Sequence, residues 1–284
     1  MNLTAVAAPR FEYPRVLSIA GSDSGGGAGI QADLKTFAAL GCFGMTAITA
    51  LTAQNTVGVR SIHSVPAQML RDQIDAVIED IGVDAVKIGM LHSAETVREV
   101  AGAIDRHGLR EVVLDPVMMS TSGARLIDDE AQAVLVRELF RRVALVTPNL
   151  DEAGLLVDRQ LRTEADMELA AREMLAMGAA AVLLKGGHLE GDTVSDLLLA
   201  QGGEPLWMRA PRIATANTHG TGCTLSSAIA AQLALGAELK HAVALARAYV
   251  RGALQAGAAV RTGAGSGPLN HGHAPHAMRL VPLS

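Results

Sequence analysis

The sequence predicts an α/β fold in which a mainly parallel sheet is covered by helices on both faces. Short apolar runs, which are typical of buried strands, alternate with longer segments whose apolar residues recur at helical spacing. The chain has 284 residues, of which 49% are hydrophobic, so it can bury a large core. Because the sequence contains neither an internal repeat nor an evident linker, we expect one main domain.

The expected strands and helices follow one another regularly. The first strand spans 16–20 and the second spans 45–53, with a helix from about residue 30 to Gly41 between them. Further strands are expected at 85–90, 112–114, 144–146 and 181–184. Further helices are expected at 66–81, 94–105, 129–140, 165–177, 224–235 and 239–255. The runs 194–199 and 206–208 predict a small hairpin at one edge of the sheet.

Composition and charge exclude several functions. With 24 Lys+Arg, 29 Asp+Glu and only 2% aromatic residues, the chain has no basic patch or stacking platform, so we expect no nucleic acid partner. Cys42 and Cys223 form neither a C-x-x-C pair nor a metal-binding spacing, which favours a reducing cytoplasm. Residues 1–15 lack the apolar region of a signal peptide, and no apolar run could span a bilayer. We therefore expect no membrane partner.

A polar, glycine-rich loop at 217–224 runs directly into a predicted helix. Glycines remove side chains at this point, so backbone N–H groups can face a ligand with the positive helix end behind them. Gly220, Thr221 and Gly222 are therefore candidates for binding a phosphoryl group. Cys223 lies in the first turn, where the helix field is expected to lower the thiol pKa below its ordinary value of about 8.5. Taken alone, the loop also fits a simple turn beside a buried cysteine.

Other polar or small residues lie at the ends of predicted strands, where the sites of parallel sheets gather. A second glycine-rich segment, 21–29, matches neither the dinucleotide fingerprint nor the G-x-x-x-x-G-K-[ST] phosphate loop, which argues against an oxidoreductase. The amide of Gln54 can donate to and accept from a heteroaromatic ring, although it could equally cap its own turn. We expect one shared cleft lined by Gly21, Gln54, Met90, Asp115, Asn149 and Lys185.

Several co-linear segments between about residues 16 and 273 carry a more specific signal. They are 20–23, 26–36, 48–56, 87–91, 147–150, 184–188 and 217–223. Together they closely resemble the hydroxymethylpyrimidine and phosphomethylpyrimidine kinases of thiamine biosynthesis, within the ribokinase-like superfamily. The resemblance implies a three-layer α/β/α sandwich. It also implies an N-terminal extension at 1–14, one kinase domain at 15–262 and a C-terminal tail at 263–284.

The resemblance further implies a kinase that uses ATP and Mg²⁺ to phosphorylate 4-amino-5-hydroxymethyl-2-methylpyrimidine, and then its monophosphate. The implied pyrimidine pocket contains Gly21, Asp33, Gln54 and Met90. The implied anion hole is Gly220, Thr221 and Gly222, with Cys223 in the position of the catalytic base. On the nucleotide side the resemblance implies Lys185, Asn149 and Thr218, and around the metal Asp115, Asn149 and Glu152. A homodimer is implied in the same way.

Two departures from the family pattern leave questions open. Ser24-Gly25 replaces a more frequent Pro-Ser, which bears on the stiffness of the substrate loop, and Gly272 replaces an aromatic residue between His271 and His273. These histidines and His276 could hold a metal, but a mobile or tucked-in tail is the more favoured expectation.

Two alternative functions stay open. Pyridoxal kinase activity is one, because pyridoxal is also a small ring that bears a hydroxymethyl group. A non-catalytic ligand-binding relative is the other. The joint presence of Asp115, Asn149, Glu152, Lys185 and Cys223 argues against the second alternative.

Overall fold

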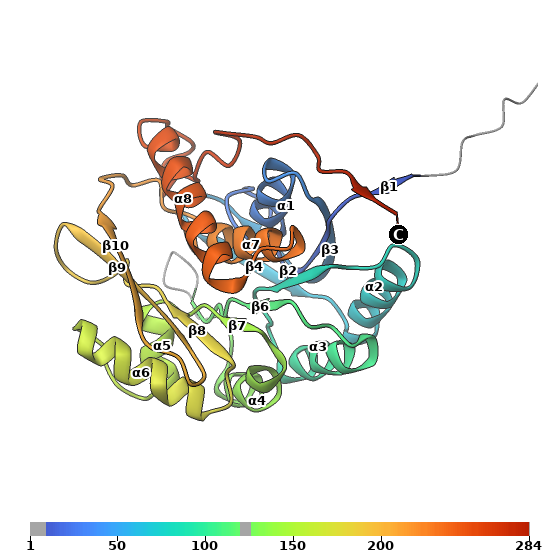
Figure 1. Ribbon diagram of the computed structural model, residues 1–284, viewed down its shortest axis with the longest axis horizontal. Helices are drawn as coiled ribbons and strands as arrows, with labels where there is room; N and C mark the ends of the chain where they lie inside the picture. The colour runs from blue at the N-terminus through green and yellow to red at the C-terminus, as the bar shows by residue number, and fades with distance from the viewer. Residues whose placement is uncertain (1–9, 120–125, 284) are drawn as a thin grey trace, which may run out of the picture.

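The computed structural model describes residues 10–119 and 126–283, and these form a three-layer α/β/α sandwich (Figure 1). Within them the main sheet has nine strands in the order β10-β9-β8-β7-β6-β5-β2-β3-β4. The neighbours from β8 to β3 in this order run parallel, whereas β9, β10 and β4 pair antiparallel at the edges. The predicted fold class and edge hairpin are therefore confirmed.

The strands have the following bounds: β2 Arg15–Asp23, β3 Phe43–Gln54, β4 Val59–Ser64, β5 Ala85–Ile88, β6 Val112–Leu114, β7 Leu145–Val146, β8 Ala181–Leu184, β9 Thr193–Ala200 and β10 Leu206–Pro211. One face is covered by α1 Gly29–Ala39, α7 Thr221–Ala234 and α8 Leu239–Gly257. The other face is covered by α2 Ala67–Asp80, α3 Ala94–His107, α4 Asp129–Leu139, α5 Leu150–Leu156 and α6 Glu164–Ala176, with a 3₁₀ turn at Phe140–Arg142. Aliphatic side chains dominate the buried layer on each face of the sheet.

The strand order reverses next to β2, and this reversal positions the site. From β2 the chain crosses through α1 to β3 on one side, then returns to place β5 on the other side. In an open parallel sheet such a switch leaves a crevice at the carboxyl ends of the two diverging strands. Gly21, near the end of β2, and Met90, just after β5, line this crevice together with the N-terminus of α7.

Three features differ from the expected elements. The first strand does not stop at Gly21 but continues to Asp23 through an irregularity in its pairing with β3. The edge strand β4 was not predicted, because its largely exposed sequence shows no apolar run. Helix α5 was also not predicted, although Asn149 and Glu152 form the capping box that begins it.

The end of the chain packs against the rest of the molecule. A short strand β1, Phe11–Glu12, pairs with β11, Val281–Pro282, so parts of the predicted extension and tail contact each other. The tail backbone also accepts a hydrogen bond from the His219 N–H at Gly267. In the described part of the chain, no helix is long and apolar enough to cross a membrane.

Candidate active site

A cleft of about 710 Å³ opens at the carboxyl ends of β2, β5 and β6, beneath the N-terminus of α7. It brings together all but one of the residues predicted for the site: Gly21, Gln54, Met90, Asp115, Asn149, Glu152, Lys185, Thr218, Gly220, Thr221, Gly222 and Cys223. A larger and more open groove of about 1500 Å³ along α5, α6 and β9 contains none of them. The smaller cleft is therefore the candidate active site, because it gathers the polar residues of the strand ends.

The loop from Gly220 to Gly222, called the anion loop below, forms the start of α7 and carries few side-chain atoms. Gly220 is the N-cap of α7 and has a φ of 82°, a left-handed conformation that favours glycine. A side chain there would also collide with the carbonyl oxygen of Gly27, so the two glycine-rich segments are in direct contact. A Cβ on Gly222 would lie 3.1 Å from the Lys185 ammonium. The Lys185 ammonium therefore lies directly beside the start of α7.

The expectation that the helix field lowers the pKa of Cys223 is wrong for this structure. Burial of the thiol raises its pKa to about 11, and the carboxylates of Asp33 and Asp115 add to the rise. The Lys87 ammonium and the Gly29 N–H group act in the opposite direction but do not outweigh burial. Cys223 is therefore a neutral thiol at pH 7.

Asp33, which was expected in the substrate pocket, lies beneath it instead. Its carboxylate is fully buried and accepts hydrogen bonds from Ser18 Oγ at 2.6 Å and Ser227 Oγ at 2.7 Å. It also pairs with the buried Lys87 ammonium at 2.9 Å. Burial alone would lower the pKa of Lys87, but the Asp33 carboxylate reverses this and holds the pKa above its ordinary value. These partners occupy Asp33, while Lys87 lines the floor of the cleft near Cys223.

A second charged cluster lies on the opposite wall of the cleft. Lys185 Nζ lies 2.8 Å from Asp115 Oδ1 and 4.0 Å from Glu152 Oε2, and Thr147 donates to the same Asp115 oxygen. Burial raises the pKa of Glu152, although Lys185 opposes the rise. For Lys185, burial lowers the pKa but the two carboxylates outweigh it and raise it overall.

This cluster fits a magnesium ion that is bound mostly by phosphate and water. Mg²⁺ commonly uses one or two protein carboxylates and keeps several waters. Asp115 and Glu152 supply two carboxylates at the cleft wall, whereas Asn149 holds its side-chain oxygen against the Glu152 N–H in the capping box. Among residues 10–119 and 126–283, no group of three or more His, Cys, Asp or Glu side chains could hold an ion without such added ligands.

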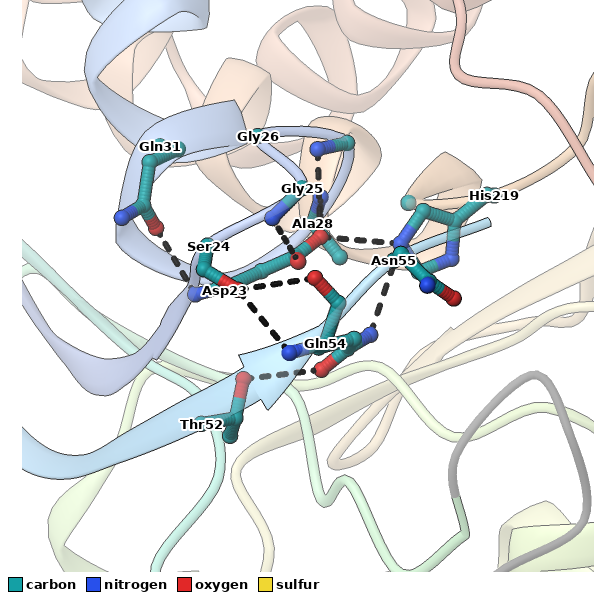
Figure 2. Close-up of polar contacts among 12 residues, drawn as sticks. Asp23, Ser24, Gly25, Gly26, Ala28, Gln31, Thr52, Gln54, Asn55 and His219 are labelled. Carbon is teal, nitrogen blue, oxygen red and sulfur yellow. Dashed lines mark hydrogen bonds and ion pairs between the residues drawn. The ribbon is translucent and has the colours of Figure 1, made fainter. Parts of the chain in front are cut away.

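One end of the cleft is built around Gln54 (Figure 2). Ser24 Oγ donates to the Gln54 carbonyl at 2.7 Å and accepts from the Gln54 N–H at 2.9 Å, which ties the glycine loop to the end of β3. The Asp23 carboxylate accepts from three loop N–H groups, those of Gly25, Gly27 and Ala28. Ser24 therefore fastens the loop at the position where a proline is more frequent.

Several lining residues were not predicted from the sequence. Lys87 could have been noticed, because a lysine in the middle of an apolar strand needs a buried partner. Asp23, the last residue of β2, contacts His219, which is 196 residues further along the chain, and local patterns cannot reveal such a contact. At the far end of the cleft, Arg247 donates to Asp196 at 2.7 Å, and Asp196 accepts the Gly186 N–H. This pair anchors the segment that follows Lys185.

The tail histidines are held by the fold. His271 Nε2 lies 3.0 Å from Thr224 Oγ1, and its carbonyl accepts from the Tyr249 hydroxyl. The ring of His273 packs on Tyr249 with 5.1 Å between centroids. The tail is thus tucked in, and the described part of the chain offers no metal cluster among these histidines.

Comparison with known proteins relates the whole chain to one family of kinases. The chain matches the family model for phosphomethylpyrimidine kinase over residues 23–270. It is 51% identical over 258 residues to the hydroxymethylpyrimidine/phosphomethylpyrimidine kinase of Rhizobium meliloti, with 90% of this chain and 96% of that protein covered. For the Bacillus subtilis protein of the same name, identity is 46% over 257 residues, with coverage of 90% and 94%.

Two solved structures are similar throughout. The phosphomethylpyrimidine kinase of Clostridium difficile gives a TM-score of 0.74 at 42% identity, covering 84% of this chain and 97% of that one. The pyridoxal kinase of Staphylococcus aureus, in complex with AMP-PCP and pyridoxal, gives 0.85 at 31% identity, covering 96% and 100%. The fold and the cleft therefore define a kinase of the ribokinase-like class. Within that class, the chain belongs to the phosphomethylpyrimidine kinase family.

Proposed function

We propose that the protein phosphorylates 4-amino-5-hydroxymethyl-2-methylpyrimidine with ATP and then phosphorylates the monophosphate to the diphosphate, for thiamine biosynthesis. The observation that carries this proposal is the single cleft that joins the Gln54 amide to the N-terminus of α7. One end offers a donor and an acceptor to a ring, and the other offers backbone N–H groups to a phosphoryl group. The family relationship supports the same reaction.

In this proposal the ring lies against Gly21, Gln54 and Met90, with its hydroxymethyl group directed toward the anion loop. Phosphoryl transfer passes through a loose transition state with charge on the equatorial oxygens, so positioning and fixed donors contribute most of the rate. Gly220 and Gly222 supply these donors, and Thr221 joins them when its N–H group leaves the Thr218 carbonyl, to which it donates in the free protein. Lys185 is released from Asp115 to contact the phosphates, assisted by Thr218 and Asn149 on the nucleotide side.

The proposal includes Mg²⁺ held near Asp115, Asn149 and Glu152. When bound, the ion would neutralise part of the negative charge on the transferring phosphates. The chain's own contribution is to hold two carboxylates and the Lys185 ammonium on one wall of the cleft. Arg247 and Asp196 keep the segment after Lys185 in place.

In the small fraction of molecules in which Cys223 is a thiolate, its sulfur accepts the proton of the alcohol, and it does so in the first reaction only. A hydroxymethyl group must lose its proton, whereas a phosphate monoester is largely ionised at neutral pH because its second pKa is about 6. Because Cys223 is mostly a neutral thiol at pH 7, we assign this base the smaller share of the rate. Transition-state binding by the anion loop carries the larger share.

A second candidate is pyridoxal kinase activity, favoured by the TM-score of 0.85 with pyridoxal kinase structures. The deciding experiment compares kcat/KM for hydroxymethylpyrimidine and pyridoxal with the same enzyme preparation. We expect the pyrimidine to be preferred, because Gln54 can pair with its aminopyrimidine edge. A preference for pyridoxal would replace the proposal with the second candidate.

A homodimer in the cytoplasm is a further part of the proposal, and gel filtration with light scattering tests the dimer.

A further inference from the structure

Two residues with no expected role lie behind the Gln54 amide. His219 precedes the anion loop and is buried, and its Nε2 lies 2.9 Å from Asp23 Oδ2 (Figure 2). Three loop N–H groups also donate to the Asp23 carboxylate. Burial alone would raise the pKa of Asp23, but its His219 and backbone donors lower it overall. Asp23 is therefore an ionised acceptor.

An ionised carboxylate has no proton to donate, so His219 must carry a proton on Nε2. This assignment follows from the 2.9 Å distance, because two acceptors would repel each other at that separation. Whatever the state of the other ring nitrogen, Nε2 acts as a donor. Any group beside Nε2 can then bond to it only as an acceptor.

Thr52 imposes a second condition from the other side of Gln54. Its hydroxyl oxygen lies 2.9 Å from the Ser22 carbonyl oxygen, which can only accept, so the hydroxyl hydrogen points there. The amide atom of Gln54 nearest to Thr52 lies 3.1 Å from the same hydroxyl oxygen. Since the single hydrogen is already used, this amide atom must be the donor, which is the nitrogen.

The two conditions select one orientation of the amide. Figure 2 draws the amide oxygen toward Thr52 and the nitrogen 3.5 Å from His219 Nε2. In that arrangement the Gln54 NH₂ group faces the Nε2–H group of His219, so two donors oppose each other. At Thr52, the Gln54 oxygen and the Ser22 carbonyl oxygen compete for the one hydroxyl hydrogen. The amide oxygen and nitrogen have nearly the same shape, and their partners decide between them. Exchanging them lets the nitrogen donate to Thr52 Oγ1 and places the oxygen beside the Nε2–H group of His219, whose hydrogen it shares with the closer Asp23 carboxylate.

We infer that Asp23 and His219 are positioning residues that determine ring specificity by fixing the orientation of the Gln54 amide. The oxygen then keeps a lone pair, and the nitrogen keeps a second N–H, for the ligand. An aminopyrimidine edge presents an amino donor beside a ring-nitrogen acceptor, which such an amide pairs with in only one orientation. The 4-oxo analogue presents the reverse pattern and meets a mismatch. The inference rests on the proposed function for its substrate, but not for the position of the proton.

The first test needs no activity. Nitrogen-15 NMR of the histidine side chains in the unliganded wild-type protein reports which ring nitrogens carry protons, and the signals missing from His219→Gln identify His219. We expect a protonated Nε2. An unprotonated Nε2 would overturn the inference.

The second test compares kcat/KM for the 4-amino substrate and its 4-oxo analogue. The wild type should prefer the amino compound, and His219→Leu should reduce this preference by about tenfold or more, because only the Thr52 hydroxyl then opposes a turn of the amide. His219→Gln retains a donor and should keep the ratio within about threefold. In a Gln54→Ala background, His219→Leu should leave the ratio unchanged. His63→Leu, at an exposed histidine of β4, is the matched control.

Equal losses for both compounds in His219→Leu would show a merely structural role and overturn the inference while the proposed function stands. If the wild type phosphorylates neither compound, the proposed function fails, and the proton position on His219 alone decides the inference.

Discussion

At the scale of single residues, Cys223 shows how burial can outweigh a helix field. The sequence places the thiol in the first turn of a helix, and this position is confirmed. The sequence does not show how deeply the sulfur is buried or that Asp33 and Asp115 lie near it, and these raise its pKa to about 11. The local position of a residue was predictable, whereas its electrostatic surroundings depend on contacts distant in the chain.

The pH dependence of the first reaction follows from this pKa. Below about 11, each pH unit increases the thiolate fraction tenfold, so kcat/KM for the alcohol should rise with pH above neutrality. The monophosphate reaction should lack this rise. Cys223→Ala should slow the alcohol reaction by about 10²-fold and flatten its pH profile. Comparable losses in both reactions would contradict the role of Cys223 as a base.

The Lys87–Asp33 pair makes a second prediction at this scale. Lys87→Met leaves the Asp33 carboxylate buried without its cation, which should lower the free energy of unfolding by about 3–5 kcal/mol. The double variant Asp33→Asn/Lys87→Met should recover much of this loss, because no uncompensated charge remains. Urea unfolding of the three proteins measures both effects. A loss below about 1 kcal/mol in the single variant would mean that the buried pair is not important for stability.

At the scale of elements, most strands and helices could be predicted because apolar periodicity dominates a sheet buried on both faces. Helix α5 and strand β4 were not predicted from the sequence, and the reasons differ. The seven residues of α5 are too few to establish a period, although its capping box was readable at Asn149 and Glu152. Strand β4 is an exposed edge strand without an apolar pattern. It is ordered by its hydrogen bonds to β3, which the sequence of β4 alone does not indicate.

Gly220 and Gly222 at the start of α7 are expected to have different roles, one in the backbone conformation and one in catalysis. Gly220→Ala places a side chain at positive φ against Gly27, so it should lower the free energy of unfolding by about 1–2 kcal/mol or more. Gly222→Ala is compatible with the helix but points its methyl group toward Lys185. It should retain stability and lose about 10²-fold or more in kcat. Thermal unfolding and steady-state kinetics on both variants separate the effects, and a stable, active Gly220→Ala would refute the assignment of its backbone role.

At the scale of the whole molecule, the site exists because distant segments meet at one sheet edge. Strand-end residues such as Gln54 and Asp115 were predictable, since parallel strands deliver their ends together. The contacts of Asp33 and the Asp23–His219 pair were not, because they depend on how α1 and α7 pack side by side. The docking of the tail onto Thr224 and Tyr249 was likewise decided by tertiary contacts.

The docked tail links acid stability to His271. Burial lowers the pKa of His271 from 6.5 to about 4, so the unfolded chain binds its proton first as the pH falls. The contribution of His271 to the free energy of unfolding is therefore fully present above about pH 6.5. It falls by on the order of 3 kcal/mol as the pH drops to about 4. His271→Gln should show a smaller loss of unfolding free energy over that window. Identical acid dependence in the variant and the wild type would exclude this linkage.

The central claim is that one cleft performs two successive phosphorylations. Phosphorus-31 NMR of the protein with ATP, Mg²⁺ and 4-amino-5-hydroxymethyl-2-methylpyrimidine tests it most directly. We predict that a phosphomonoester resonance appears first and is then replaced by the two resonances of a diphosphate ester, with ADP formed at each step. Absence of any phosphorylated pyrimidine, while ATP stays intact or is only hydrolysed, would refute the two-step reaction.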